Sequence, residues 1–527
     1  MTGVAGAQNG SGDDLGGRSG DAFRERLKEE PDSSSALAAA EERLARLLPG
    51  AVDFFRRRGA TTLGQTARLL NAPHGRPSAT LLRAAARLAS EGRQPRTAQA
   101  AVDALAQGRP VLAAGHHGLE THPELAQGGL LFGLPAILDR EPRPTVALAS
   151  SAVPLNNPTA PGGLLLGRRR ADGRRLQLRL FPRSQDQIMV SRAPALTRQA
   201  VTACLTRLPR EDGWSPPERR AAAAFLERFL LAPAFLAWPS FAAQAAWLAS
   251  EVWAARFRPA AAAPPPPLVQ LELEALAADC LVVDLARPDS PAARTLFEPR
   301  VREALTADLA GRRGAWSASL LALDASDRRV DGAPALGTLF FWGVDPKGRR
   351  LSLALGRRGR QASLVGPGLE VPLTPGGVAE ALADRRIVPG LFLDYLVLAA
   401  HGLRAHGGVY MLDYLPRLLA PAARRLEVPL GWTPLLAAGP LPLGLQGPEG
   451  FAGLGGFTAA GGLELAGPWP SGLFEALDAL PLAAVWPFTA GEWLAEETPP
   501  AERGTGGRSP GPPALRLEDF GGGWRSA

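Results

Sequence analysis

Histidine is rare in this chain, and half of it lies in one short segment. The chain has 6 histidines in 527 residues, yet His116, His117 and His122 lie close together with Glu120. A neutral imidazole can accept or donate a proton near neutral pH, and a neighbouring carboxylate can orient the ring. The segment therefore predicts acid–base chemistry, with His116 or His117 transferring the proton, Glu120 orienting the ring and His122 as a further catalytic candidate.

Two other interpretations of this histidine segment remain open. Imidazole and carboxylate groups are zinc ligands, although His116 and His117 are adjacent and the spacing differs from the helical His-Glu-x-x-His pattern. One or two of the histidines can instead cap a following helix or bond backbone carbonyls. The sequence therefore identifies neither a metal nor a cofactor.

Two further groups of scarce polar residues are candidates for binding a substrate. Asn156 and Asn157 lie in a proline-rich stretch, where their amides can pair with a polar ligand. His406, Tyr410 and Asp413 surround a glycine pair that lets the backbone approach another group closely. Each group has a structural alternative, because Asn before Pro commonly forms turns and tyrosines at helical spacing are commonly core residues.

The first two groups follow two predicted strands. Residues 110–114 and 144–149 are short apolar runs typical of buried strands, and a helix is predicted to start near Pro123 between them. Strand, helix and strand in this order form a βαβ unit, whose strands run parallel and end at the same edge of the sheet. We therefore expect the histidine segment and the asparagine loop, 150–163, to meet at that edge.

The rest of the chain shows further periodic patterns. Helical spacing predicts helices at 36–48, 79–88, 196–208, 217–231 and 241–256. Apolar runs predict strands at 280–284 and 317–323, and two similar stretches, 173–180 and 348–355, are each expected to be the returning strand of a hairpin. Residues 387–416 are typical of an apolar helix followed by a glycine turn, with His401 as a capping or core histidine.

Composition divides the chain into five parts. Residues 1–35 and 497–527 are rich in glycine, proline and polar residues and are expected to be disordered tails. Residues 259–267 contain four consecutive prolines and are expected to be a stiff linker. This linker separates an α/β domain at 36–258, which carries the histidine segment, from a second α/β domain or half at 268–496.

The composition argues against a membrane protein and against a fold held by disulfides. With 46% hydrophobic and 21% charged residues, the chain is expected to be a soluble protein. Its two cysteines, Cys204 and Cys280, lie in apolar surroundings, which favours buried thiols in a reducing compartment. No apolar run approaches the roughly 18 residues of a membrane helix, and no signal-peptide pattern opens the chain, so we expect a cytoplasmic location and no membrane partner.

The charged residues narrow the choice of partner. The net charge of +7 is modest for this length, and the scattered arginines form no nucleic-acid motif, which argues against nucleic acid as a partner. No phosphate-binding P-loop or convincing dinucleotide fingerprint is present. A small-molecule substrate is the expected partner, and nothing in the sequence indicates an oligomeric state.

One segment resembles a known family. The stretch 109–123 is similar to the opening motif of the bacillithiol-biosynthesis cysteine-adding enzymes, where a strand runs into a Gly-Gln-Gln loop, with His116 and His117 in the place of glutamine. The segment from Gly407 to Tyr414 is similar to that family's glycine-rich stretch ending in tyrosine. The resemblance implies a Rossmann-like core with helical additions and a ligase-like reaction that joins an amino acid to an amino sugar.

Together these patterns predict an α/β protein with a Rossmann-like parallel sheet core, helical additions and β-hairpins. The expected function is that of an enzyme acting on a small polar or anionic metabolite by histidine acid–base chemistry. The alternative is a non-catalytic small-molecule-binding or scaffold protein that uses the same cleft. Conversion of a bound ligand distinguishes the two.

Overall fold

The computed structural model describes most of the chain between the two terminal regions. The described residues are 42, 45–46, 49–91, 95–116, 118–119, 123–157, 162–169, 175–256, 266–309, 336–358, 361–407, 409–427 and 473–482. The predicted tails, most of the proline-rich linker and the strand predicted at 317–323 lie outside these residues. Among the described residues, no helix is both long and apolar enough to cross a lipid bilayer.

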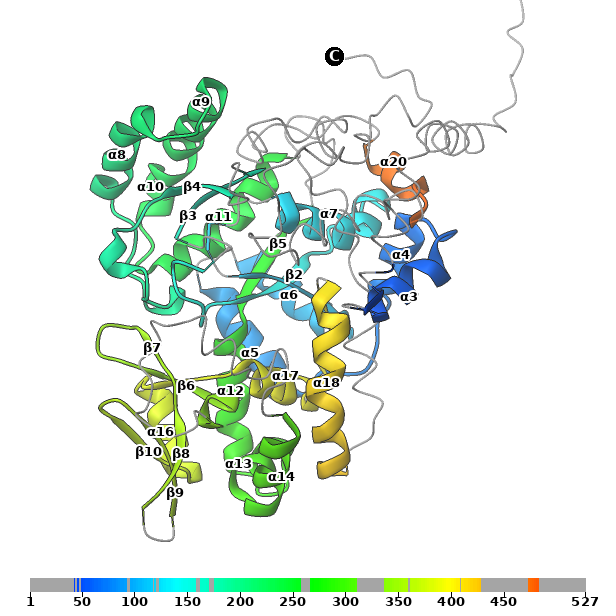
Figure 1. Cartoon of the computed structure of the whole chain (residues 1–527). Helices are drawn as coiled ribbons and strands as arrows, with labels where there is room; N and C mark the ends of the chain where they lie inside the picture. Colours follow the sequence, from blue (N-terminus) through cyan, green and yellow to red (C-terminus); the bar gives the residue numbers. More distant parts are fainter. Residues whose placement is uncertain are drawn as a thin grey trace, which may run out of the picture.

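A four-stranded parallel sheet forms the centre of a mixed α/β fold (Figure 1). Its strands lie in the order β12, β1, β2, β5, with bounds Ala405–His406, Val111–His116, Thr145–Ser150 and Leu268–Glu272. Every neighbouring pair in this sheet is parallel. The predicted α/β class with a parallel sheet is therefore confirmed.

The predicted βαβ unit is present. β1 is followed by α7, Pro123–Leu138, and then by β2, and the two strands pair in parallel with His116 opposite Ser150. Proline suits the first turn of a helix because its missing N–H would have no partner there. Gly133 lets α7 approach β2 closely, since a Cβ at this position would lie 2.9 Å from Thr145 Oγ1. The loops after β1 and β2 therefore leave the same edge of the sheet, as expected.

The sheet takes strands from both sides of the proline-rich segment. β1 and β2 precede that segment, whereas β5 and β12 follow it and add to opposite edges of the sheet. The chain therefore extends the sheet in one direction from β1 to β5 and then returns to place β12 on the other side of β1. In open parallel sheets, a crevice at such a reversal is a common place for ligands.

One hydrophobic core joins the sheet to a layer of helices. Val146 and Leu148 of β2 and Val269 and Leu271 of β5 belong to it, because alternate residues of a strand face the same side. The helices packed in this core include α5 Ala79–Ser90, α6 Pro95–Ala106, α12 Leu273–Leu285, α17 Leu391–Ala400 and α18 Val409–Leu426. The helix predicted at 79–88 is thus confirmed as α5, whose cap Ser78 accepts a hydrogen bond from Leu81 N.

A second core lies in the region inserted between β2 and β5, at the upper left of Figure 1. Its elements are β3 Gly163–Arg169, β4 Arg175–Arg179, α8 Arg198–Arg207, α9 Pro216–Phe225, the π-helix Leu226–Leu230, α10 Pro233–Leu236 and α11 Phe241–Arg256. β3 and β4 are antiparallel, as the hairpin prediction requires. The helices predicted at 196–208, 217–231 and 241–256 are all found, with small shifts of their ends.

Two small antiparallel sheets lie at the lower left of Figure 1. They contain β6 Phe341–Val344, β7 Arg350–Leu351 and β11 Ile387–Pro389, and β8 Ala354–Arg358, β9 Gln361–Gly366 and β10 Leu369–Pro372, with α16 Pro375–Ala383 beside them. The returning strand predicted at 348–355 is found only in part. Residues 350–351 pair with β6, whereas β8 starts at Ala354 and pairs with β9 instead.

The strand predicted at 280–284 is wrong, because these residues form the last turns of α12. A short apolar run fits a buried strand and a buried helix equally well, and here the run forms the second half of a helix that also buries Leu276 and Ala277. The remaining helices are α3 Pro49–Arg58, α4 Leu63–Leu70, α13 Pro291–Phe297, α14 Pro299–Leu309 and α20 Leu473–Ala479, with short 3₁₀ turns at Arg183–Gln185, Val190–Arg192, Leu208–Arg210 and Leu336–Leu339. Within the helix predicted at 36–48, residues 42, 45 and 46 are described and are helical.

Candidate functional site

The carboxyl edge of the parallel sheet carries most of the polar groups of interest. β1 ends at His116 and β2 ends at Ser150, and these two residues are register partners. His117, Glu120 and His122 lie outside the described residues, as does the side chain of His116. The structure therefore places the start of the histidine segment at the expected edge, and the catalytic roles remain predictions.

The asparagine loop leaves the same edge and runs along a neighbouring segment. Asn156 N donates to Asp186 O at 3.1 Å and Leu155 N donates to Ile188 O at 2.9 Å. The Asn156 side chain is exposed, and Asn157 is partly buried. Backbone hydrogen bonds thus hold the loop at a fixed place beyond the carboxyl end of β2, and binding of a substrate by the two amides stays a prediction.

His406 is the sequence-predicted residue whose surroundings are best defined. It ends β12, pairs with Leu112 of β1 and is only 1% exposed. Its ring lies 6.3 Å from the Phe132 ring of α7, centroid to centroid, and inclined at 45°. Among the residues that the structure describes, neither ring nitrogen has a hydrogen-bond partner. A buried polar atom without a partner costs about 1–3 kcal/mol, so the His406 ring nitrogens lower the stability of the folded state.

The environment keeps the His406 ring neutral. Burial lowers the pKa of His406 to about 3, and the charges of Arg404 and His74 act in the same direction. A neutral imidazole offers one N–H donor and one acceptor nitrogen, and no described residue bonds to either. A bound anion beside the ring would oppose these effects and raise the pKa.

The segment after His406 carries the last two predicted residues. Tyr410 and Asp413 lie in the first turns of α18, which starts at Val409 directly after the glycine pair. Their side chains are outside the described set. The backbone N–H groups of the first turn of a helix favour negative charge, so this position suits an anionic or polar ligand group.

Three carboxylates at or near this edge, Glu272, Glu274 and Asp394, were not identified from the sequence. Glu274 accepts hydrogen bonds from Ser150 Oγ at 2.5 Å, Ser151 N at 2.8 Å and Ala152 N at 3.1 Å. Burial raises the pKa of Glu274, and the hydrogen bonds from Ser150 and Ser151 partly oppose this. Glu274 thereby fixes the chain as it leaves β2, which makes it a positioning group for the asparagine loop.

Glu272 and Asp394 extend this acidic region. Glu272, the last residue of β5, accepts a hydrogen bond from Ser151 Oγ at 2.6 Å, and burial raises its pKa against the effects of Ser151 and Arg192. Burial also raises the pKa of Asp394 well above its usual value, with the charge of Glu274 as the second cause. The Glu-Leu-Glu sequence was the available signal, since it begins with the last residue of the apolar run that forms β5.

A serine, a histidine and an aspartate line up elsewhere in the core. His401 Nδ1 lies 2.6 Å from Ser78 Oγ, and His401 Nε2 lies 3.2 Å from Asp284 Oδ2. Ser78 Oγ already accepts the cap hydrogen bond of α5, and His401 is the C-cap of α17. These contacts tie the ends of α5, α12 and α17 together, so we assign the group a structural role, in agreement with the prediction for His401.

Several other expectations can be compared with the structure. Cys204 and Cys280 are buried free thiols, as predicted, and burial raises their pKa values to about 11 and about 12. Within the described ranges, no cluster of three or more histidine, cysteine or acidic residues has a geometry that could hold a metal ion.

Comparison with protein-family models, with curated proteins and with solved structures found no match.

Proposed function

We propose that the protein is an enzyme that acts on a small polar or anionic metabolite at the carboxyl edge of its parallel sheet. The observation that carries this proposal is the buried His406 ring, whose two nitrogens have no partner among the described residues. A buried polar group without a partner calls for an explanation, such as a bound water, an ion or a functional role, and a bound metabolite would supply one here. His406 would supply one donor and one acceptor to the metabolite.

The position of His406 supports the same proposal. It ends β12, the edge strand that pairs with β1 where the order of strands reverses, and it precedes the glycine pair and the positive end of α18. We propose that this arrangement is a Rossmann-like core whose crevice receives the ligand. His116 or His117 from the neighbouring loop would then transfer the proton, with Glu120 as the orienting group and His122 nearby.

The reaction class and location form part of this proposal. Resemblance of 109–123 to the cysteine-adding enzymes favours a ligase-like reaction between an amino acid and an amino sugar. Buried free thiols at Cys204 and Cys280 suit a reducing compartment, so we propose a cytoplasmic location.

A non-catalytic binding function is the second candidate, and one observation favours it. A histidine whose pKa is lowered to about 3 is a weak base at neutral pH, so His406 alone suits binding better than proton transfer. Under this alternative the same crevice would hold a metabolite without converting it.

A ligand screen separates the proposals. Thermal stability of the full chain would be measured with amino acids, amino sugars and nucleotides, and then repeated with His406→Leu and with Asn157→Ala. A ligand that stabilises the wild type and fails to stabilise His406→Leu would support the site. Equal stabilisation of both proteins by every ligand would contradict it. Mass spectrometry of the ligand after incubation then shows whether it is converted, which decides between enzyme and binding protein.

A further inference from the structure

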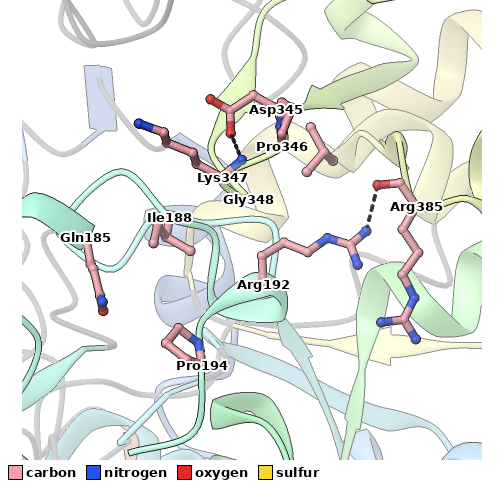
Figure 2. A pocket seen from close by; sticks show the side chains of 10 residues that line it. Gln185, Ile188, Arg192, Pro194, Asp345, Pro346, Lys347, Gly348 and Arg385 are labelled. Atoms are coloured by element: carbon pink, nitrogen blue, oxygen red, sulfur yellow. Dashed lines mark hydrogen bonds between the residues drawn. The ribbon is translucent and has the colours of Figure 1, made fainter.

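A cavity of about 370 Å³ lies between the inserted region and the small antiparallel sheets (Figure 2). Residues 185–194 line one side, and residues 344–348 with Arg385 line the other. Met189 N donates to Gly348 O at 3.0 Å, so a backbone hydrogen bond holds the two sides together. The volume is within the range of small-molecule sites, which is about 300–1,000 Å³.

The lining carries three cationic side chains, Arg192, Arg385 and Lys347. In the part of the chain that the structure describes, none of the three has a carboxylate oxygen within ion-pair distance. Asp345 is the one acidic residue in the lining, and it is already used by Arg349, whose Nε donates to it at 2.6 Å. Asp345 also accepts from Lys347 N at 2.8 Å. The cavity therefore has an excess of positive charge.

Arg192 shows the consequence of this excess. Its Nη2 donates to Arg385 O at 3.1 Å, and in Figure 2 the two arginine side chains lie next to each other. Its Nε is buried and has no hydrogen-bond partner among the described residues. Burial lowers the pKa of Arg192, the charge of Arg385 adds to this, and Glu272 opposes it. Two like charges are thus held close together with a donor left unused.

Arg385 is held in a conformation that normally favours glycine. Its φ is 56°, directly after α16, and the next amide, Arg386 N, closes the helix end by donating to Ala381 O at 2.8 Å. Helices often end in this left-handed conformation, and glycine is the usual residue because it has no Cβ. The helix end does not require arginine at this position, and Arg385 is one of the residues that line the cavity.

We propose that this cavity binds the phosphate group, or another doubly charged oxyanion, of a small molecule. Guanidinium groups bind such oxyanions through paired hydrogen bonds, and a phosphate carries a charge of about −1.5 to −2 at neutral pH. An oxyanion bound beside Arg192 and Arg385 accepts hydrogen bonds from their guanidinium groups and offsets the repulsion between the two cations. This site is separate from the crevice at His406 and does not depend on its function.

Inorganic phosphate is a direct probe of the site. Isothermal titration calorimetry of the full chain at constant ionic strength should show saturable binding of phosphate and sulfate and weaker binding of acetate. Arg385→Gly removes one cation and also removes the left-handed strain, so the variant is expected to fold while it binds phosphate at least about tenfold more weakly. Arg192→Gln is expected to weaken binding to a similar degree.

Arg140→Gly is the matched control. Arg140 follows α7 with a φ of 54° and is also exposed, but it does not line the cavity. The Arg140→Gly variant should therefore bind phosphate as the wild type does. The proposal fails if the wild type shows no saturable binding of phosphate, if Arg385→Gly binds it as tightly as the wild type, or if Arg140→Gly weakens it equally.

Discussion

Replacement of His406 by leucine is expected to change the stability of the protein in acid. The folded pKa of His406 is lowered to about 3, mainly by burial, whereas a histidine in an unfolded chain has a pKa of about 6.5. Below pH 6.5 the unfolded chain therefore binds a proton that the folded protein does not bind until about pH 3. Stability contributed by the neutral ring is fully present above pH 6.5 and falls as the pH decreases through this window.

The size of the effect follows from the shift in pKa. One pKa unit corresponds to about 1.4 kcal/mol, and pH 4.5 lies two units below the pKa of histidine in the unfolded chain. Because of His406, the free energy of unfolding of the wild type should therefore be about 3 kcal/mol lower at pH 4.5 than at pH 7. The buried carboxyls act in the opposite direction, because Glu272, Glu274 and Asp394 have raised pKa values and bind protons more readily when folded. Their contribution is common to wild type and variant, so it cancels in the difference between them.

Urea denaturation of both proteins at pH 4.5 and pH 7, followed by circular dichroism, measures this difference. The wild type should lose about 3 kcal/mol more than His406→Leu between the two pH values. At pH 7 the variant should be about 1–2 kcal/mol more stable, since leucine removes two buried polar atoms that lack partners. His74→Leu removes an exposed imidazole and, with it, only the smallest of the three causes that lower the pKa of His406, so it should not reproduce the effect. Equal losses in wild type and His406→Leu would refute the argument, because the ring would then have to reach water or a partner.

Three further predictions test other parts of the structure. Glu274→Ala should lower the free energy of unfolding by about 2–4 kcal/mol, because it leaves the buried donors after β2 without an acceptor, and Glu274→Gln should lose less; urea denaturation at pH 7 measures both. His401→Ala should cost about 2–4 kcal/mol, since it removes the ring that contacts Ser78 and Asp284 and opens a buried cavity, whereas His401→Gln, which can still reach one neighbour, should cost less. Arg140→Gly and Arg385→Gly should each stabilise the protein by about 0.5–1 kcal/mol, because the relief of left-handed strain exceeds the added entropy of glycine in the unfolded chain. Loss of stability in both glycine variants would contradict that last argument.

The elements predicted well are those whose signals are local. β1, α7 and β2 were identified because turn residues bound two apolar runs, and proline marks the start of the helix between them. Their parallel arrangement then follows from the connection, since a strand, helix and strand in one sheet almost always form a right-handed parallel unit. The edge at which His116 ends its strand was therefore predictable from residues within about 40 positions of each other.

The parts that were missed depend on contacts between distant segments. Ser150 Oγ and Glu274 are 124 positions apart in the chain, and Arg192 and Arg385 are 193 apart. Neither pair has a local signal, because each partner alone is an ordinary polar residue. The strand predicted at 280–284 failed for a related reason, since packing against α5 and α17 decides that this apolar run is helical.

The two proposed sites lie near opposite edges of the parallel sheet, and we do not expect one ligand to occupy both. His406 belongs to β12 at one edge of the sheet, whereas Arg192 of the cationic cavity is close enough to Glu272, the last residue of β5 at the other edge, for their charges to interact. Three strand spacings of about 4.8 Å separate β12 from β5, a distance of roughly 14 Å. A small metabolite that uses both nitrogens of His406 therefore does not also reach Arg192. Phosphate binding that survives in His406→Leu and fails in Arg385→Gly would demonstrate this independence, and loss of phosphate binding in His406→Leu would instead mean that the two edges form one site.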